Sequence, residues 1–273
     1  EVLEVTGNAA VVSLDSDTPF TTVNLSDSDD QTLNLNDGYT QATTVVVNAA
    51  SDDTINNNAN VALTVNAYSG AVGANFNLTG SSGNADTINI TAVTNNQTNT
   101  FDTGNDVFET INVVPYTAGA DVTIVTGAYA LSAALGSTQL TINAASGDAL
   151  SVMTITGTSS VTPLNITTGA AADIIALGTK ADTVNSGAGN DEITTLGGVN
   201  TINSGDGVDT IILGNAIDNV NAGAGNDIIT ASDKLANTDV IDGGDGVDTI
   251  TIGTDLAAAD VISVTGGLSN LEV

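Results

Sequence analysis

The chain has 273 residues, with 2 Lys or Arg against 32 Asp or Glu, so its formal charge at pH 7 is -30. This charge excludes nucleic acid and anionic membrane as partners, because both require a basic protein surface. Histidine and cysteine are absent, which excludes thiolate chemistry and disulfides and requires that any bound metal be held by oxygen. No run of about 18 apolar residues is present, so we expect no membrane span.

The first 167 residues contain short runs of Thr, Val, Ile, Leu and Asn that are typical of strands separated by tight turns. These runs are Thr22–Leu25, Thr32–Leu35, Thr44–Val47, Leu63–Asn66, Thr87–Ile90, Thr110–Val113 and Leu140–Asn143. A parallel β-solenoid and a β-sandwich both fit this pattern. We favour the solenoid, because its coils can run directly into the repeats that follow.

Two acidic clusters precede the repeats, one at Asp15 and Asp17 and one at Asp27, Asp29 and Asp30. Neither cluster has glycines around it. We therefore interpret both as solvated loops rather than as metal sites.

From residue 173 onward an Asp or Asn recurs with a nine-residue spacing, which two short insertions interrupt. Its members are Asp173, Asp182, Asp191, Asn200, Asp209, Asp218, Asp227, Asp239, Asp248 and Asp260. A branched aliphatic residue follows two positions after each, from Ile175 to Ile262. Such a period indicates stacked coils, in which the aliphatic side chains point inward and the Asp residues line one edge of each turn.

Four of these Asp residues end loops with glycine at the second and fourth of six positions, namely residues 186–191, 204–209, 222–227 and 243–248. Glycine permits positive φ and brings backbone carbonyls close to an ion. Stacked strands lie about 4.8 Å apart, and two carboxylates at that distance repel by about 3 to 4 kcal/mol at a dielectric constant near 20. The ladder therefore requires a cation, and flexible loops with hard oxygen ligands favour Ca²⁺.

These loops resemble the RTX nonapeptide repeat, with consensus Gly-Gly-x-Gly-x-Asp-x-U-x, over about residues 168–262. The resemblance implies a right-handed parallel β-roll in which six residues turn and three form a strand. It also implies that calcium lies between stacked turns, and that the chain is secreted unfolded through a type I channel. We thus predict an all-β protein with a solenoid-like region at 1–167, a β-roll at 168–262, and a connector at 263–273 that continues into a further repeat or domain.

Successive nonapeptides turn on opposite edges, so the four glycine-rich loops share one edge. The intervening loops depart from the pattern, one with Lys180 at its fourth position and another with Asn200 in place of Asp. We predict three to four calcium ions on a single edge, between Asp191 and Asp209, Asp209 and Asp227, and Asp227 and Asp248, with a weaker site between Asp173 and Asp191. The predicted ligand loops comprise Asp173, Ser186, Gly187, Ala188, Gly189, Asp191, Ser204, Gly205, Asp206, Gly207, Asp209, Ala222, Gly223, Ala224, Gly225, Asp227, Gly243, Gly244, Asp245, Gly246 and Asp248.

The Thr-, Asn-, Ala- and Gly-rich, cysteine-free composition also resembles that of surface-layer proteins of Gram-negative bacteria, as do phrases such as Leu268–Val273. This resemblance implies an extracellular structural subunit that self-associates into a lattice or filament and contacts lipopolysaccharide or another surface glycan. Two alternatives stay open: an adhesin or biofilm-matrix module with the roll as a spacer, and an accessory RTX domain of a secreted enzyme. We expect no catalysis in this chain, because His-based mechanisms are impossible and Lys180 and Lys234 are its only basic side chains.

Overall fold

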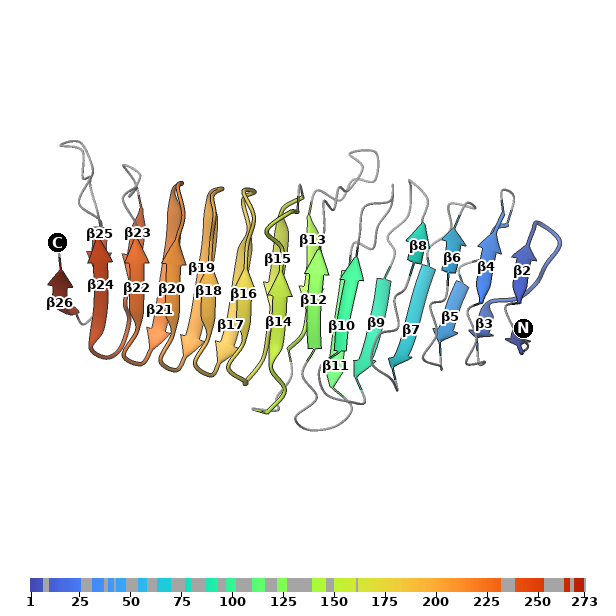
Figure 1. The fold of residues 1–273 in the computed structure, drawn as a ribbon, viewed down its shortest axis with the longest axis horizontal. Helices are drawn as coiled ribbons and strands as arrows, with labels where there is room; N and C mark the ends of the chain where they lie inside the picture. The colour runs from blue at the N-terminus through green and yellow to red at the C-terminus, as the bar shows by residue number, and fades with distance from the viewer. Residues whose placement is uncertain are drawn as a thin grey trace. The chain divides into compact units, whose positions relative to one another are not determined.

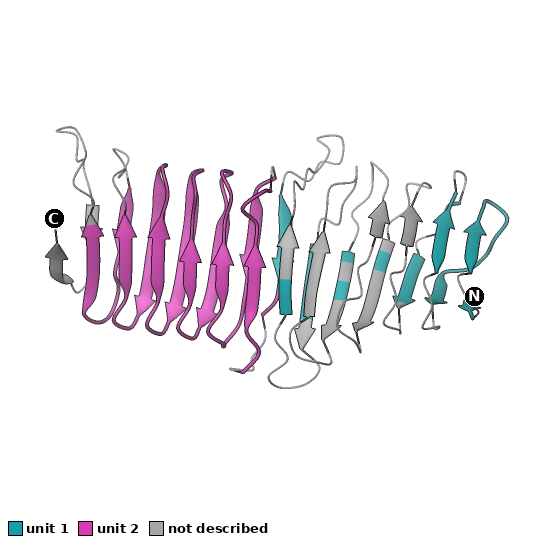
Figure 2. Cartoon of the chain, in the orientation of Figure 1, with its two compact units in different colours: residues 1–143 teal, residues 144–273 magenta. Residues whose placement is uncertain are grey.

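The computed structural model describes residues 1–6, 10–25, 31–36, 39–41, 43–47, 54–57, 63–69, 77–79, 87–92, 97–101, 110–115, 122–126, 139–145, 150–160, 162–231, 239–252, 263–265 and 268–272. Within these ranges every regular element is a β-strand. The chain divides into two compact units, residues 1–143 and 144–273, which Figure 2 distinguishes by colour. The described ranges contain no helix that is long and apolar enough to cross a membrane.

Unit 1 is built from parallel strands that stack coil upon coil (Figure 1). One sheet has the order β1 (Val2–Val5), β3 (Thr22–Leu25), β5 (Thr43–Val47), β7 (Leu63–Ser69), β9 (Thr87–Ala92), β11 (Thr110–Pro115) and β13 (Leu140–Asn143). A second sheet has the order β2 (Val11–Leu14), β4 (Thr32–Leu35), β6 (Thr54–Asn57) and β8 (Asn77–Thr79), and β10 (Gln97–Phe101) pairs with β12 (Val122–Thr126). Within each of these sheets a strand pairs in parallel with the next but one in the sequence, as in a solenoid, so the β-sandwich alternative is wrong.

The core of unit 1 follows from the two-residue alternation of its strands. In β3 and β4 the side chains of Val23, Leu25, Leu33 and Leu35 are buried, while the Thr and Asn between them are half-buried. Tyr39 is buried, and its hydroxyl contacts the carbonyl oxygen of Phe20 and the hydroxyl of Thr43. Aliphatic columns thus hold the described coils of this unit together.

Unit 2 consists of two parallel sheets that face each other across an aliphatic core. One sheet has the order β15 (Leu164–Thr167), β17 (Thr183–Ala188), β19 (Asn200–Asp206), β21 (Asp218–Ala224), β23 (Val240–Asp242) and β25 (Ser263–Thr265). The other has the order β14 (Met153–Thr156), β16 (Ile174–Ala176), β18 (Glu192–Thr194), β20 (Thr210–Leu213), β22 (Ile228–Ala231), β24 (Asp248–Ile252) and β26 (Leu268–Glu272). The chain alternates between the sheets, so a coil comprises one strand of each, as Figure 1 shows for β16 to β22.

The nine-residue period sets the register of unit 2. Residues 18 apart pair on successive coils, as Val184 does with Ile202 and Ile193 with Ile211. The insertion before Asp239 lengthens this step to 21 residues, so that Val220 pairs with Ile241. The predicted aliphatic column is confirmed from Ile175 to Ile250, where its members are at most 1% exposed.

The C-terminal end of the column differs from the prediction. Asp260 and Ile262 lie outside the described residues, but Ile241 pairs with Val264 and not with Ile262. A longer second insertion moves the register by two residues, which a count by nine does not detect. The segment predicted as a connector holds β25 and β26, which pair with β23 and β24. The predicted domain bounds otherwise stay a prediction.

One local feature also differs from the division into six turn and three strand residues. β17, β19 and β21 continue through the first three loop positions, so that Gly187, Gly205 and Gly223 pair in parallel register. A residue without Cβ allows the two backbones to approach closely here. The turn itself therefore occupies only the last three loop positions.

Candidate metal centre

The five loops that connect the β15–β25 sheet to the β14–β26 sheet form what we call the glycine edge. They comprise residues 168–173, 186–191, 204–209, 222–227 and 243–248. The loops of the opposite edge, residues 177–182, 195–200 and 213–218, form what we call the apolar edge. Since every coil contributes one loop to each edge, equivalent residues stack along the axis of the roll.

The sixth-position Asp residues of the glycine edge form a ladder of buried carboxylates. The backbone N–H of each Asp donates to Oδ1 of the Asp on the next coil, at 2.8 Å from Asp173 to Asp191, 2.8 Å from Asp191 to Asp209, and 2.8 Å from Asp209 to Asp227. The bond from Asp227 to Asp248 measures 3.0 Å. These side chains are at most 1% exposed, so the coils hold one oxygen of every carboxylate inside the protein.

The second carboxylate oxygen is left without a partner. Oδ2 of Asp191, Asp209, Asp227 and Asp248 is buried and has no hydrogen bond. A buried charged oxygen without a partner is costly, and a ladder of them points to a ligand that the protein itself does not supply.

The electrostatics of the ladder agree with this view. The pKa of Asp191 is raised to about 6, mainly by burial and less by the charges of Asp173 and Asp209, against the hydrogen bond from the Asp173 N–H. Burial likewise raises the pKa of Asp227 to about 6, with added repulsion from Asp209 and Asp248. The pKa values of Asp173 and Asp209 are also raised by burial. An ionised ladder is therefore unfavourable unless a cation neutralises it.

The glycines bring backbone oxygens to the same edge. At the second and fourth loop positions all the glycines from Gly187 to Gly246 have positive φ, for example 104° at Gly205 and 147° at Gly207. A Cβ at Gly205 would lie 1.8 Å from the carbonyl oxygen of Gly187, and one at Gly207 would lie 1.7 Å from that of Gly189. Each glycine thus lies directly against a carbonyl of the preceding coil, and only glycine fits there.

The first loop position decides how much room the carboxylate has. It is occupied on the glycine edge by Thr168, Ser186, Ser204, Ala222 and Gly243. A Cβ at Gly243 would lie 2.4 Å from Oδ2 of Asp248, so this position faces the carboxylate directly. The hydroxyls of Ser186 and Ser204 donate to the carbonyls of Ser204 and Ala222 at 2.8 Å and tie successive coils together.

The apolar edge has a ladder of the same form but a different lining. The N–H of Asp182 donates to Oδ1 of Asn200 at 2.9 Å, and that of Asp218 donates to Oδ1 of Asp239 at 2.7 Å. The first loop position is filled here by buried Leu177, Thr195 and Leu213. Two of the three loops thus have a large aliphatic side chain where the glycine edge has Thr, Ser, Ala or Gly.

Asn200 replaces a charge in this second ladder with a donor. Its Nδ2 donates to Oδ1 of Asp218 at 2.9 Å and to the carbonyl of Gly197 at 3.2 Å. Asp182, one coil earlier, keeps a buried Oδ2 without a hydrogen bond, and burial raises its pKa to about 6. Gly198 is the one fourth-position glycine among the described apolar-edge loops, with φ of 86°.

The residues of the glycine edge fit calcium, whereas the restriction of calcium to this one edge stays a prediction. Calcium takes six to eight oxygen ligands, commonly a mixture of carboxylates and backbone carbonyls. Among the described residues no group of three or more Asp, Glu, His or Cys side chains gathers around one point, so carbonyls must complete each coordination shell. The carboxylates of Asp173, Asp191, Asp209, Asp227 and Asp248, with carbonyls of the loops between them, would hold the ions.

The structure brings together every pair of Asp residues for which a calcium site is predicted, each on successive coils. The assignment of ligands and the count of three to four ions stay predictions. Asp15 and Asp17 of unit 1 bond only within their own turn in the contacts resolved there, with the Asp17 N–H donating to Asp15 Oδ1 at 3.2 Å. Asp27, Asp29 and Asp30 lie outside the described residues.

Sequence reasoning missed an alternation at the third and fifth positions of the glycine edge. Asn190 and Asn226 each accept a hydrogen bond at 2.9 Å from the N–H of the next fifth-position residue, which is Val208 or Val247. The third position alternates in step, with Ala188 and Ala224 in the Asn loops and exposed Asp206 and Asp245 in the Val loops. The signal was readable in the loop sequences as a two-loop repeat.

A parallel β-roll in which buried Asp residues stack beside glycine-rich loops is typical of a repeat protein whose coils bind a metal ion. The model of the RTX calcium-binding nonapeptide repeat matches the chain in four copies, at residues 167–202, 177–211, 212–233 and 236–254. These residues therefore form an RTX calcium-binding repeat region within unit 2, as the resemblance predicted. No curated protein and no solved structure matches the chain.

Proposed function

We propose that this protein is a structural subunit of a calcium-dependent bacterial surface layer, sheath or extracellular filament, which folds when it meets calcium after secretion. The observation that carries the proposal is the ladder of buried carboxylates with unpartnered Oδ2 atoms from Asp191 to Asp248. At low calcium, repulsion and desolvation keep the roll open and the chain remains suited to export through a type I channel. At millimolar extracellular calcium, weak sites with dissociation constants of about 10⁻⁴ to 10⁻³ M fill and close the coils.

A structural role also agrees with what the chain offers chemically. It has no histidine or cysteine and only two basic side chains, which leaves no His-based triad or Lys and Arg cluster for catalysis. Strands β17, β19 and β21 present Thr and Asn outward and aliphatic residues inward over successive coils. We infer that the protein contributes length and rigidity rather than a reaction, and that it associates with copies of itself and with a surface glycan such as lipopolysaccharide.

The test is a calcium titration of chelator-treated protein, followed by circular dichroism for β-structure and by negative-stain electron microscopy for assembly. We expect β-structure and ordered sheets or filaments to appear together in the millimolar range, and magnesium at equal concentration to produce neither. Folding without assembly would instead identify a spacer, as in an adhesin or matrix module. Full β-structure with the chelator present would contradict the calcium requirement itself.

A further inference from the structure

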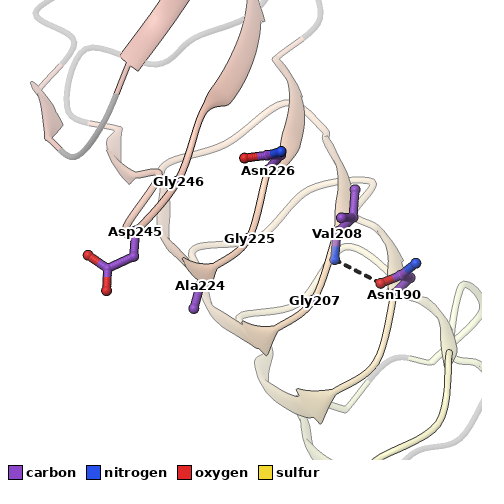
Figure 3. A pocket seen from close by; sticks show the side chains of 8 residues that line it. All are labelled: Asn190, Gly207, Val208, Ala224, Gly225, Asn226, Asp245 and Gly246. Atoms are coloured by element: carbon purple, nitrogen blue, oxygen red, sulfur yellow. Dashed lines mark hydrogen bonds between the residues drawn. The ribbon is translucent and has the colours of Figure 1, made fainter.

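The glycine edge carries an open pocket of about 380 Å³, lined by residues of four successive loops. Its floor is the backbone of Gly207, Gly225 and Gly246, and it is hollow because these residues have no side chains. Figure 3 shows Asn190, Val208 and Asn226 along its length, and the Asp245 side chain extending away from the ribbon. A cavity of about 150 Å³ admits a benzene-sized group, so this one has room for an aliphatic side chain.

Some of the polar atoms that line this pocket already have hydrogen-bond partners within the protein. Oδ1 of Asn190 is already engaged by the N–H of Val208, and Oδ1 of Asn226 by that of Val247. The Val208 side chain remains 45% exposed. Asp206 and Asp245 add exposed negative charge at this edge, so the glycine edge combines an apolar hollow with an acidic rim.

The apolar edge presents the opposite character on the other side of the same coils. Leu196, Val199 and Ile217 are 47%, 59% and 40% exposed. Val199 and Ile217 occupy equivalent positions on successive coils, and Leu196 belongs to the same loop as Val199. Lys180, one of only two basic side chains in the chain, is exposed one coil earlier.

The two edges differ in shape and in charge. One offers an apolar protrusion beside a cation, and the other an apolar hollow beside two carboxylates. They lie on opposite sides of the roll, so one molecule cannot join its own edges, whereas a second copy can. Contact between two different surfaces of identical subunits is heterologous, and such contacts propagate into open arrays unless a rotation closes them.

We propose that the apolar edge of one copy docks into the glycine edge of a second copy. Leu196 and Val199 enter the pocket between the stacked loops, and Lys180 pairs with Asp245 or Asp206 at its rim. The rolls then lie side by side, and calcium orders the pocket because the same loops hold the ions. The inference rests on the proposed self-assembling function and specifies the surface that carries it.

The test uses one variant of each edge in the complete chain. Leu196→Asp combined with Val199→Asp places carboxylates on the apolar edge, and Val208→Asp places one in the pocket. We expect each variant to fold with calcium by circular dichroism and to stay monomeric by light scattering under conditions where the wild type forms arrays. Ile228→Asp, at a position 44% exposed on the outer face of β22, is the matched control and should assemble like the wild type.

Mixing the two edge variants distinguishes this contact from any symmetric one. Each variant retains one intact edge, so an equimolar mixture should form 1:1 dimers that grow no further. Arrays formed by either edge variant alone, or assembly lost in the Ile228→Asp control but kept in the edge variants, would overturn the docking inference and leave the proposed function standing. A wild type that folds with calcium but never assembles would overturn the proposed function and this contact together.

Discussion

The backbone N–H of Asp191 donates to Oδ1 of Asp209 at 2.8 Å, while Oδ2 of Asp209 is buried without a hydrogen-bond partner. One oxygen of the carboxylate thus joins two coils, and the other is available to a metal. The two functions can be separated by chemistry, because an amide keeps the first oxygen and replaces the second with nitrogen.

Asp209→Asn should therefore preserve the coil-to-coil hydrogen bond and weaken calcium binding at the two sites that share this residue. We expect the calcium concentration for half-maximal folding to rise by about tenfold, equivalent to about 1.4 kcal/mol. The measurement is a calcium titration monitored by circular dichroism. An unchanged midpoint would remove Asp209 from the metal centre.

Asp182→Asn is the matched substitution on the apolar edge and should act in the opposite direction. Asn200 already shows an amide at the equivalent position, where it donates to Asp218 and to the carbonyl of Gly197. Removing the unpartnered buried oxygen of Asp182 should stabilise the protein by about 1 kcal/mol or more at pH 7. Thermal unfolding measures this gain, and a tenfold loss of calcium affinity would show that this edge also binds metal.

Gly207→Ala should destabilise the folded protein strongly. Its φ is 147°, and a Cβ would lie 1.7 Å from the carbonyl oxygen of Gly189. Backbone strain alone costs about 1 to 3 kcal/mol, and the overlap adds to it. Gly197→Ala is the control, because the nearest atom to its Cβ is 3.9 Å away. Equal melting temperatures for the two variants would contradict the stacked geometry.

The response to pH should reverse with calcium. Burial raises the pKa of Asp182 and Asp218 from 3.8 to about 6. A carboxyl whose pKa is higher in the folded state binds its proton more tightly there, so its stabilising contribution is complete below about pH 4 and is lost as the pH rises through about 6. Without calcium, we expect the β-structure content measured by circular dichroism to fall between pH 5 and pH 7, as the roll opens.

With saturating calcium the melting temperature should instead rise over the same interval, because the ions require ionised Asp191, Asp209 and Asp227. Both series can be recorded by circular dichroism in one buffer system, with and without chelator. Parallel curves would show that protonation and metal binding do not compete for these carboxylates.

Much of the structure of unit 2 could be predicted because a short sequence repeat determines its register and the positions of its glycines. Nine residues per half-coil place Ile193 over Ile211 and Asp191 beside Asp209, and glycine at alternate loop positions is required by the backbone itself. The sequence could not reveal which carboxylate oxygen joins the coils, because the two oxygens are chemically equivalent and only the folded geometry distinguishes them. Nor did it reveal the unpartnered Oδ2 of Asp182, because the loop sequence does not show whether a buried oxygen finds a hydrogen-bond partner.

The predicted strand register was wrong where an insertion interrupts the nine-residue spacing. Counting by nine placed Ile262 beside Ile241, whereas the longer insertion brings Val264 there. In unit 1 the strands follow Thr-x-Asn runs, but the distance between paired residues varies from 20 between Val2 and Thr22 to 31 between Thr110 and Thr141. In unit 1 the strands therefore keep the inward aliphatic pattern, but the number of residues per coil varies.

The alternation of Asn190, Val208, Asn226 and Val247 gives the glycine edge a longitudinal pitch of two coils, or about 10 Å. A neighbouring roll displaced by a single coil would face Asn in place of Val at the fifth loop position, and Ala in place of Asp at the third. In the docking that we propose, this pattern would let a neighbouring roll shift only in steps of two coils, and it would thereby set the stagger between adjacent rolls.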